Sequence, residues 1–343
     1  MRIAAIEHVL PARKVTNDWI EDRIRERKQP LLPEVQIDTL VGRTRGYLAA
    51  AGTDVRYHLD EHERPVDLAA EAGRKALVAA GVPPDDVDFL IYCGVARGWI
   101  EPATAPAIQA LLGLRRATAF DVLEACAGWL RALQIAHAYL RSGCYRRGLI
   151  VNCECGIERY EDWSFDSVES LEQRIAAFTI GEAATATLVE MTREPDDFYF
   201  TFKTTGDHVG LCMIPLPGVE LFNPSGVDSR LSPGKFFSLS QELADVVGNE
   251  IVALYRSDAR LHGRYDICFG HEVSERVCER VTRALGVHDV YFPTHRRYGN
   301  TASASIPLGM STAQREGHLV RGSRVLVIVG ASGVSAGFGT FTF

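Results

Sequence analysis

Residues 119–140 read AFDVLEACAGWLRALQIAHAYL, and this stretch predicts a short buried strand that passes directly into a buried helix. Residues 119–123 are mostly apolar, and from Trp129 onward apolar residues recur at helical spacing with few charges. The turn between them, Ala125 to Gly128, consists of small residues and contains Cys126. The N-terminus of a helix lowers the pKa of a nearby thiol, whereas most isolated cysteines are simply buried. The turn therefore suits either a nucleophilic cysteine or a structural one.

Composition narrows the class of protein. The chain has 343 residues, of which 46% are hydrophobic and 24% charged, which is typical of a soluble globular protein with two domains or one duplicated unit. A net charge of −7 gives no support to nucleic-acid binding. No apolar run reaches the roughly 18 residues that span a bilayer, and the N-terminus reads as a first strand rather than a signal peptide. We therefore expect a cytoplasmic protein without membrane insertion.

The eight cysteines are expected to be reduced thiols. Several lie inside apolar runs that read as strands, such as LIYCGV and DICFGH, and a chain of this length does not need disulfide bonds. Cys153-Glu154-Cys155 is the one pattern that invites a metal site. Its one-residue spacing has no second matching pair, so we expect no metal.

Strands and helices alternate along the chain. In the first half we expect strands at 3–6, 88–96, 119–123, 146–154 and 180–191, and helices after an N-cap at Asn17 and at 66–81, 104–114, 129–140 and near 165–178. In the second half we expect strands at 265–271, 289–294, 324–333 and 335–343, and helices at 237–258, 274–287 and 301–317. Residues 37–60 resist assignment, and 191–209 and 216–226 read as a charged spacer and a proline-rich segment.

The two halves repeat one order of elements, which predicts a duplicated βαβαβ unit with halves 1–190 and 191–343. Sheets of this kind would pack back to back with the two central helices between them. The helix N-termini would then bring Cys126 and Asn300 to one central site. His271 follows a strand of the second half, and ligand sites of such sheets lie at the carboxyl ends of strands. We therefore predict a Cys-His-Asn triad.

Three motifs carry a family resemblance: D-V-x-x-A-C-A-G around Cys126, G-H-x-x-x-x-R from Gly270, and Y-G-N-T-A-S-A-S-I-P from Tyr298. The chain resembles the β-ketoacyl-acyl carrier protein synthase III group of the thiolase superfamily over nearly its whole length. The resemblance implies an α/β, thiolase-like fold of five layers, α-β-α-β-α, and a homodimer. A thiolase would be expected to carry a second catalytic cysteine near the C-terminus, but no cysteine follows Cys278.

The resemblance also implies a mechanism. Cys126 would attack an acyl thioester and hold the acyl group, with its own backbone N–H and the 332–334 loop, Gly333 and Val334 included, forming the oxyanion hole. His271 Nε2 and the Asn300 amide would donate hydrogen bonds to the carbonyl of a malonyl thioester during decarboxylation. The substrates would be thioesters of coenzyme A or of the phosphopantetheine of a carrier protein, with no metal or other cofactor.

Several residues near the triad are candidates for binding the carrier. Arg276 stands where the family places a carrier-contacting arginine, and Ser274 stands where an asparagine commonly contacts the pantetheine arm. Nearby cations could hold a phosphate or an acidic carrier protein: Arg280, Arg283, Arg296 and Arg297. The alternative is a solvated helix face whose arginines pair with Glu275 and Glu279.

The chain departs from the family where substrate access and pocket shape are set, while the triad is kept. The departures are Glu272 to Ser274 after the histidine, Glu182 in Gly181-Glu182-Ala183-Ala184, the closing loop Ala331-Ser332-Gly333-Val334, and the 37–60 region. They favour decarboxylative condensation on an unusual acyl group, in polyketide or other specialised metabolism, over housekeeping fatty-acid biosynthesis. The chief rival is acyl transfer to a hydroxyl or amine, with His271 as a general base. A non-catalytic partner subunit is a third interpretation.

Overall fold

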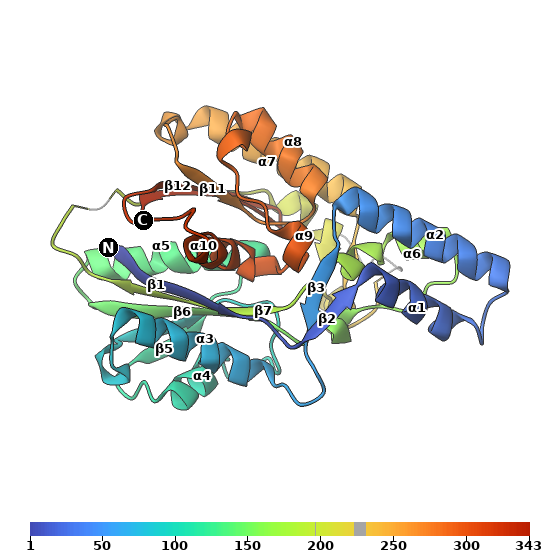
Figure 1. Ribbon diagram of the computed structural model, residues 1–343, viewed down its shortest axis with the longest axis horizontal. Coiled ribbons are helices and arrows are strands. Elements are labelled where there is room, and N and C mark those ends of the chain that lie inside the picture. Colours follow the sequence, from blue (N-terminus) through green and yellow to red (C-terminus); the bar gives the residue numbers. More distant parts are fainter. Residues whose placement is uncertain (196, 223–230) are drawn as a thin grey trace.

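The computed structural model describes residues 1–195, 197–222 and 231–343, and it has the five layers expected (Figure 1). Two helices, α5 (Gly128–Arg141) and α10 (Ser305–Arg315), lie side by side between two sheets. Their apolar side chains form one core with the inner faces of both sheets, including Trp129, Leu133, Met310 and Ala313. This arrangement places the N-termini of both central helices in the middle of the molecule.

The first sheet has the strand order β1-β7-β6-β4-β5. Its strands are β1 (Arg2–Val9), β4 (Phe89–Tyr92), β5 (Thr118–Asp121), β6 (Arg147–Glu154) and β7 (Ala183–Glu190). β4 is parallel to β5 and β6, and β7 is antiparallel to β6 and β1. Helices α3 (Pro65–Ala80) and α4 (Ala105–Leu112) cover the outer face. β5 is the sheet edge, and Leu123, predicted to be buried, is 63% exposed there.

The second sheet has the order β11-β12-β13-β8 and is covered by α7 (Ser240–Ser257) and α8 (Glu275–Leu285). Its strands are β8 (Tyr199–Thr204), β11 (Ile267–Gly270), β12 (Arg324–Ala331) and β13 (Ser335–Thr342). Two predictions are wrong here. The spacer at 191–209 contains β8, and the strand expected at 289–294 is reduced to a bridge between Cys268 and Tyr291, because Pro293 cannot donate to a ladder.

The turns before the two central helices share an unusual backbone conformation. Ala125 and Ala302 have φ values of 44° and 45°, in the left-handed region that non-glycine residues seldom adopt. Each opens a single 3₁₀ turn, Ala125–Ala127 and Ala302–Ala304, that leads into α5 or α10. The duplication is therefore visible in the backbone. The position equivalent to Cys126 is Ser303, and Asn300 lies three residues before it.

An extension formed by residues 13–58 packs beside the two halves. α1 (Asn17–Lys28) and α2 (Glu34–Ala51) lie against each other, next to the small sheet of β2 (Arg13–Thr16) and β3 (Val55–His58). α2 occupies the segment that the sequence left unassigned. The N-cap of α1 is Thr16, whose hydroxyl accepts from the Trp19 N–H, rather than the predicted Asn17.

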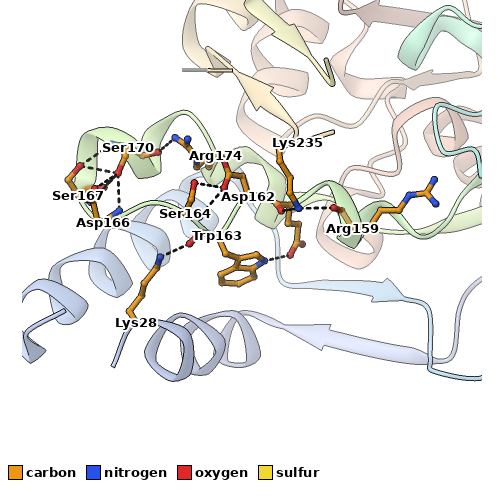
Figure 2. A network of polar contacts seen from close by, with 11 residues as sticks. Lys28, Arg159, Asp162, Trp163, Ser164, Asp166, Ser167, Ser170, Arg174 and Lys235 are labelled. Carbon is orange, nitrogen blue, oxygen red and sulfur yellow. Dashed lines mark hydrogen bonds and ion pairs between the residues drawn. The ribbon is translucent and has the colours of Figure 1, made fainter. Parts of the chain in front are cut away.

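A polar network holds the segment from residue 157 to 179 against this extension (Figure 2). Lys28 of α1 donates to the Trp163 carbonyl, and Arg174 pairs with Asp162 at 2.7 Å. Lys235 donates to the Arg159 and Glu161 carbonyls, at 2.9 and 2.8 Å. The network fixes the segment that carries Ile157 and Tyr160, and both residues line a cavity between the two halves.

The remaining short elements complete the described chain. They include the helices α6 (Val168–Glu172) and α9 (His295–Tyr298) and the strands β9 (Cys212–Met213) and β10 (Phe237–Ser238). Short 3₁₀ segments lie at Pro84–Asp86, Ile157–Tyr160, Ile175–Thr179, Gly206–Leu211, Val219–Leu221, Ala259–Leu261 and His288–Val290. Part of the predicted proline-rich segment, 223–226, lies outside the described residues. No helix in the described ranges combines the length and apolarity needed to cross a bilayer.

Candidate active site

A cavity of about 340 Å³ lies between the two halves, and Cys126, His271 and Asn300 all line it. Cys126 comes from the turn before α5, His271 follows β11, and Asn300 follows α9. The rest of the wall is mostly apolar and includes Ile157, Tyr160, Met213 and Phe236. The three side chains that the sequence singled out therefore converge on one cavity.

The environment of Cys126 differs from the prediction that a helix N-terminus lowers its pKa. Burial raises the pKa of the Cys126 thiol well above its ordinary value, and nearby Cys212 and Glu154 raise it further. The Cys126 backbone N–H acts in the opposite direction but does not offset burial. The thiol is thus held protonated, and its activation needs a group that accepts its proton.

His271 is placed to be such a group. Its Nδ1 atom lies 2.8 Å from the Gly330 carbonyl oxygen, and its Nε2 atom lies 3.1 Å from Asn300 Oδ1. Both oxygens can only accept, so Nδ1 carries a proton, and the contact with Asn300 Oδ1 becomes a hydrogen bond when Nε2 also takes up a proton. Burial lowers the pKa of His271, while the contacts with Gly330 and Asn300 raise it. The lowered pKa favours the neutral ring, whose Nε2 can accept a proton next to Asn300 Oδ1.

The Asn300 amide is oriented by its own turn. Its Oδ1 atom accepts from the Ala302 N–H at 2.9 Å, so the NH₂ group is the end left to donate. The backbone of Asn300 is clasped on both sides, because its N–H donates to the Thr179 carbonyl and its carbonyl accepts from the Gly181 N–H. A Cβ atom at Gly181 would lie 1.9 Å from the Tyr298 carbonyl oxygen, so only glycine fits.

The loop after β12 supplies only part of the predicted oxyanion hole. The Val334 N–H donates to the Thr205 carbonyl at 3.1 Å, and the Val334 carbonyl accepts from the Thr205 N–H. This pairing continues the ladder between β13 and β8, so the Val334 N–H is not available to a substrate. Ser332 lines the cavity beside Cys126, and Gly333 follows it with φ of 130°. The loop donor is therefore to be sought at residues 332–333.

The predicted carrier-binding residues separate into two groups. Ser274 lines the cavity and caps α8 through its hydroxyl, which accepts from the Val277 N–H, and Arg276 next to it is exposed with no ion pair in the described residues. Arg280 instead bridges to Asp245 of α7 at 2.9 Å, and Arg297 pairs with Glu316 at 2.6 Å. Neither lines the cavity. Arg283 pairs with Glu279, as the alternative of a solvated helix face requires.

A buried carboxylate beside the site was not singled out as a functional residue in the sequence analysis. Glu154, at the end of β6, accepts hydrogen bonds from the Val95 and Ala96 N–H groups and from Ser303. It thereby joins the first sheet to the turn before α10. The available signal was an acidic residue ending an otherwise apolar strand. Cys153 and Cys155 are free thiols, and the described residues contain no metal-binding cluster of His, Cys, Asp or Glu.

Two acidic residues next to triad residues have structural roles. Glu272, beside His271, accepts from the Tyr291 hydroxyl at 2.6 Å and from the Thr294 and His295 N–H groups. Glu124, two residues before Cys126, forms a two-pronged ion pair with Arg131 at 2.6 and 3.0 Å. Both carboxylates therefore hold segments next to triad residues in place.

Comparison with known proteins agrees with this geometry. Residues 120–207 match the family described as 3-oxoacyl-acyl-carrier-protein synthase III, and residues 262–343 match its C-terminal domain. The first match contains Cys126, and the second contains His271 and Asn300. Both matches indicate the β-ketoacyl-acyl carrier protein synthase III-like branch of the thiolase superfamily. The protein is an acyltransferase of the condensing-enzyme type.

Relatives of this branch match along almost the whole chain. Beta-ketoacyl-acyl-carrier-protein synthase III of Neisseria meningitidis is 28% identical over 341 residues, covering 98% of this chain and 96% of the relative. The Streptococcus suis protein of the same name is 28% identical, covering 97% and 95%. Among solved structures, Xanthomonas campestris OleA aligns with a TM-score of 0.84 at 22% identity, covering 99% and 96% of the two chains. The synthase III of Aquifex aeolicus aligns with a TM-score of 0.79 at 21% identity, covering 99% of each.

Proposed function

We propose that the enzyme is a ketosynthase that loads an acyl group onto Cys126 and condenses it with a malonyl thioester. In the first step the Cys126 thiol gives its proton to Nε2 of neutral His271 while the sulfur attacks the thioester carbonyl. The tetrahedral oxyanion is held by the Cys126 N–H and a donor from residues 332–333. The C–S bond to the carrier then breaks, and the proton passes from His271 to the departing thiolate, which leaves as a thiol.

In the second step the malonyl thioester loses CO₂, and its carbonyl oxygen takes up the developing negative charge of the enolate. The Asn300 NH₂ group donates to that oxygen, and its orientation is fixed by the Ala302 N–H. The enolate carbon attacks the acyl carbonyl on Cys126, and the C–S bond breaks. A β-ketoacyl thioester leaves, and the Cys126 thiolate takes up a proton from solvent. The carbanion comes from decarboxylation, so no base removes a proton from carbon.

The observation that carries this proposal is the position of the Asn300 amide. Its oxygen accepts from the Ala302 N–H, and Asn300 lines the cavity together with Cys126 and His271, so its nitrogen is the group left to donate to a substrate. A neutral donor at this point stabilises an enolate, and a simple acyl transfer has no need of it.

A second candidate rests on the His271 ring. Because Nδ1 donates to Gly330, neutral His271 presents a lone pair at Nε2, which suits a general base better than the donor predicted from the sequence. A base at this point would deprotonate a hydroxyl or amine acceptor. The product would then be an ester or amide, formed without loss of CO₂.

The proposal extends to partners and setting. Arg276, exposed beside Ser274 at the cavity, supports binding of a coenzyme A phosphate or an acidic carrier protein. β5 pairs with β4 and forms the edge of the first sheet, and exposed Leu123 follows it in the chain. This edge supports association into a homodimer. The changes at Glu182, Glu272 and the 331–334 loop support a role in specialised metabolism, such as polyketide biosynthesis, in the cytoplasm. The chemistry uses side chains and two thioesters, with no further cofactor.

Intact-protein mass spectrometry tests the nucleophile. After incubation with acyl-coenzyme A, the wild-type enzyme should gain one acyl mass, and Cys126→Ala should gain none. Cys212→Ala is the matched control because its thiol lines the same cavity. An adduct that survives Cys126→Ala but not Cys212→Ala would move the nucleophile to Cys212.

A further inference from the structure

The active-site cavity continues beneath the helices of the second half. Six residues of α7 line it, and they fall on one helix face: Ser240, Leu243, Ala244, Val247, Gly248 and Ile251. Ser240 and Ile251 are eleven residues apart, which corresponds to about 16 Å along the helix axis. α8 contributes Val277, Cys278, Val281 and Thr282. The cavity therefore runs along both helices, away from their N-terminal ends near the triad.

The far part of this cavity, which we call the inner arm, is lined by Gly248, Ile251, Val281, Thr282, Tyr291 and Ile328. Its polar groups are already satisfied within the protein. The Thr282 hydroxyl donates to the Cys278 carbonyl at 2.8 Å, and the Tyr291 hydroxyl donates to Glu272 at 2.6 Å. An occupant would gain no strong hydrogen bond here, so the inner arm suits an apolar group.

Gly248 is the position where the inner arm has room. A Cβ atom there would lie 3.8 Å from Arg280 Nη2 and 3.9 Å from a methyl group of Val281, which are ordinary contacts. At Gly330, which also lines the cavity, a Cβ atom would lie 2.2 Å from Val247 and could not be accommodated. Glycine inside a helix is disfavoured relative to alanine. Gly248 thus leaves open a space between α7 and α8 that a side chain could occupy.

The outer side of this space is closed. Arg280 reaches from α8 to α7, where it pairs with Asp245 at 2.9 Å and donates to the Ala244 carbonyl at 3.2 Å. The guanidinium thus bridges the two helices over this space. The inner arm and the triad line one continuous cavity, so a group attached to a molecule bound at the triad can extend into the inner arm.

We infer that the inner arm holds the apolar end of the acyl chain delivered to Cys126, and that Gly248 sets the length of chain the enzyme accepts. The inference rests on the proposed acylation of Cys126. It assigns the donor to the medium- or long-chain acyl thioesters, because a short acyl group would leave the inner arm empty.

The test compares acylation of Cys126 by decanoyl- and acetyl-coenzyme A in the full-length enzyme. Gly248→Leu should lower the ratio of the decanoyl rate to the acetyl rate by about tenfold or more, with Gly248→Ala in between. Asn249→Leu is the matched control, since it adds the same side chain at the next, exposed position of α7, and it should leave the ratio unchanged. An unchanged ratio in a folded, acylated Gly248→Leu enzyme would overturn the inference and leave the proposed function standing.

A second measurement separates failure of the inference from failure of the proposed function. Binding of decanoyl-coenzyme A to Cys126→Ala enzyme, measured by calorimetry, involves no covalent step. Adding Gly248→Leu should weaken this binding about tenfold. If the wild-type enzyme is not acylated by any donor, the proposed function fails. In that case, weaker binding after Gly248→Leu would still support the inner arm as the site of the acyl chain. Unchanged binding would refute it.

Discussion

The Nδ1 atom of His271 lies 2.8 Å from the carbonyl oxygen of Gly330, and this contact decides which ring nitrogen can take a proton. Gly330 belongs to β12 and His271 directly follows β11, which pairs with it in parallel. The tautomer is therefore set by the register of two strands, and Nε2, which lies 3.1 Å from Asn300 Oδ1, is the nitrogen that can take up a proton.

The pH dependence of acylation follows from this tautomer. Burial lowers the pKa of His271 and raises that of Cys126, so proton transfer from thiol to neutral ring is the available route near pH 7. The acylation rate, measured by quenched-flow mass spectrometry, should rise with an inflection below about 6.5, the ordinary histidine value, and then reach a plateau. A rise that continues through the alkaline range would instead indicate attack by a free thiolate.

Asn300 should separate the two half-reactions. Asn300→Ala is expected to leave Cys126 acylation within a few fold and to lower malonyl decarboxylation by about 100-fold, the cost of losing one such donor. Asn300→Asp is a second variant, because it keeps an oxygen for the Ala302 N–H and replaces the donor with a carboxylate oxygen. It should decarboxylate as poorly as the alanine variant. Loss of acylation in both variants would contradict the assigned role.

Arg276 and Arg280 should behave differently although they are on the same helix. Arg276 has no ion pair in the described chain and is expected to contact the carrier, so Arg276→Ala should raise KM for the acyl thioester about tenfold, or ~1.4 kcal/mol. Arg280 pairs with Asp245, and Arg280→Ala should leave KM nearly unchanged. Equal effects of the two variants would remove Arg276 from the carrier site.

Glu161 should make stability depend on pH. Burial raises the pKa of Glu161 to about 7, while the carboxyl of the unfolded chain titrates near 4.5. Between these values the folded state binds more protons, so the free energy of unfolding falls as the pH rises through this window. Glu161→Gln removes this titration. The free energy of unfolding of the variant, minus that of the wild type, should therefore increase by about 3 kcal/mol from pH 4 to pH 8.

Urea unfolding at several pH values measures this difference, with Glu169→Gln, at an exposed position of α6, as the control. If Glu161→Gln is instead destabilising at pH 8, then pairing with nearby Arg56 outweighs the cost of burial.

Much of the fold could be predicted because its central elements are long and apolar. The strands β6, β7 and β12 are buried on both faces and α5 packs between the two sheets, so their apolar runs stand out. β8 was missed because it lies at a sheet edge, where charged and polar residues are tolerated. The division at residue 190 remains a prediction, although the strands of the two large sheets fall on either side of it.

The convergence of Cys126, His271 and Asn300 on one cavity could be predicted, whereas their protonation states could not. Small residues around Cys126 and Asn300 marked the turns that present them. The pKa of Cys126 could not be predicted, because burial by the second half outweighs the helix terminus. The engagement of the Val334 N–H by Thr205 depends on a pairing between segments 129 residues apart, which no local pattern reveals.

The most direct test of decarboxylative condensation is release of labelled CO₂ from a malonyl thioester, supplied on coenzyme A and on a carrier protein, with a decanoyl donor present. Release that requires the acyl donor and disappears in Cys126→Ala, together with a β-ketoacyl product, is the predicted result. If Cys126 acquires the acyl mass and no CO₂ is released, the enzyme does not condense, and the acceptor is to be sought among alcohols and amines.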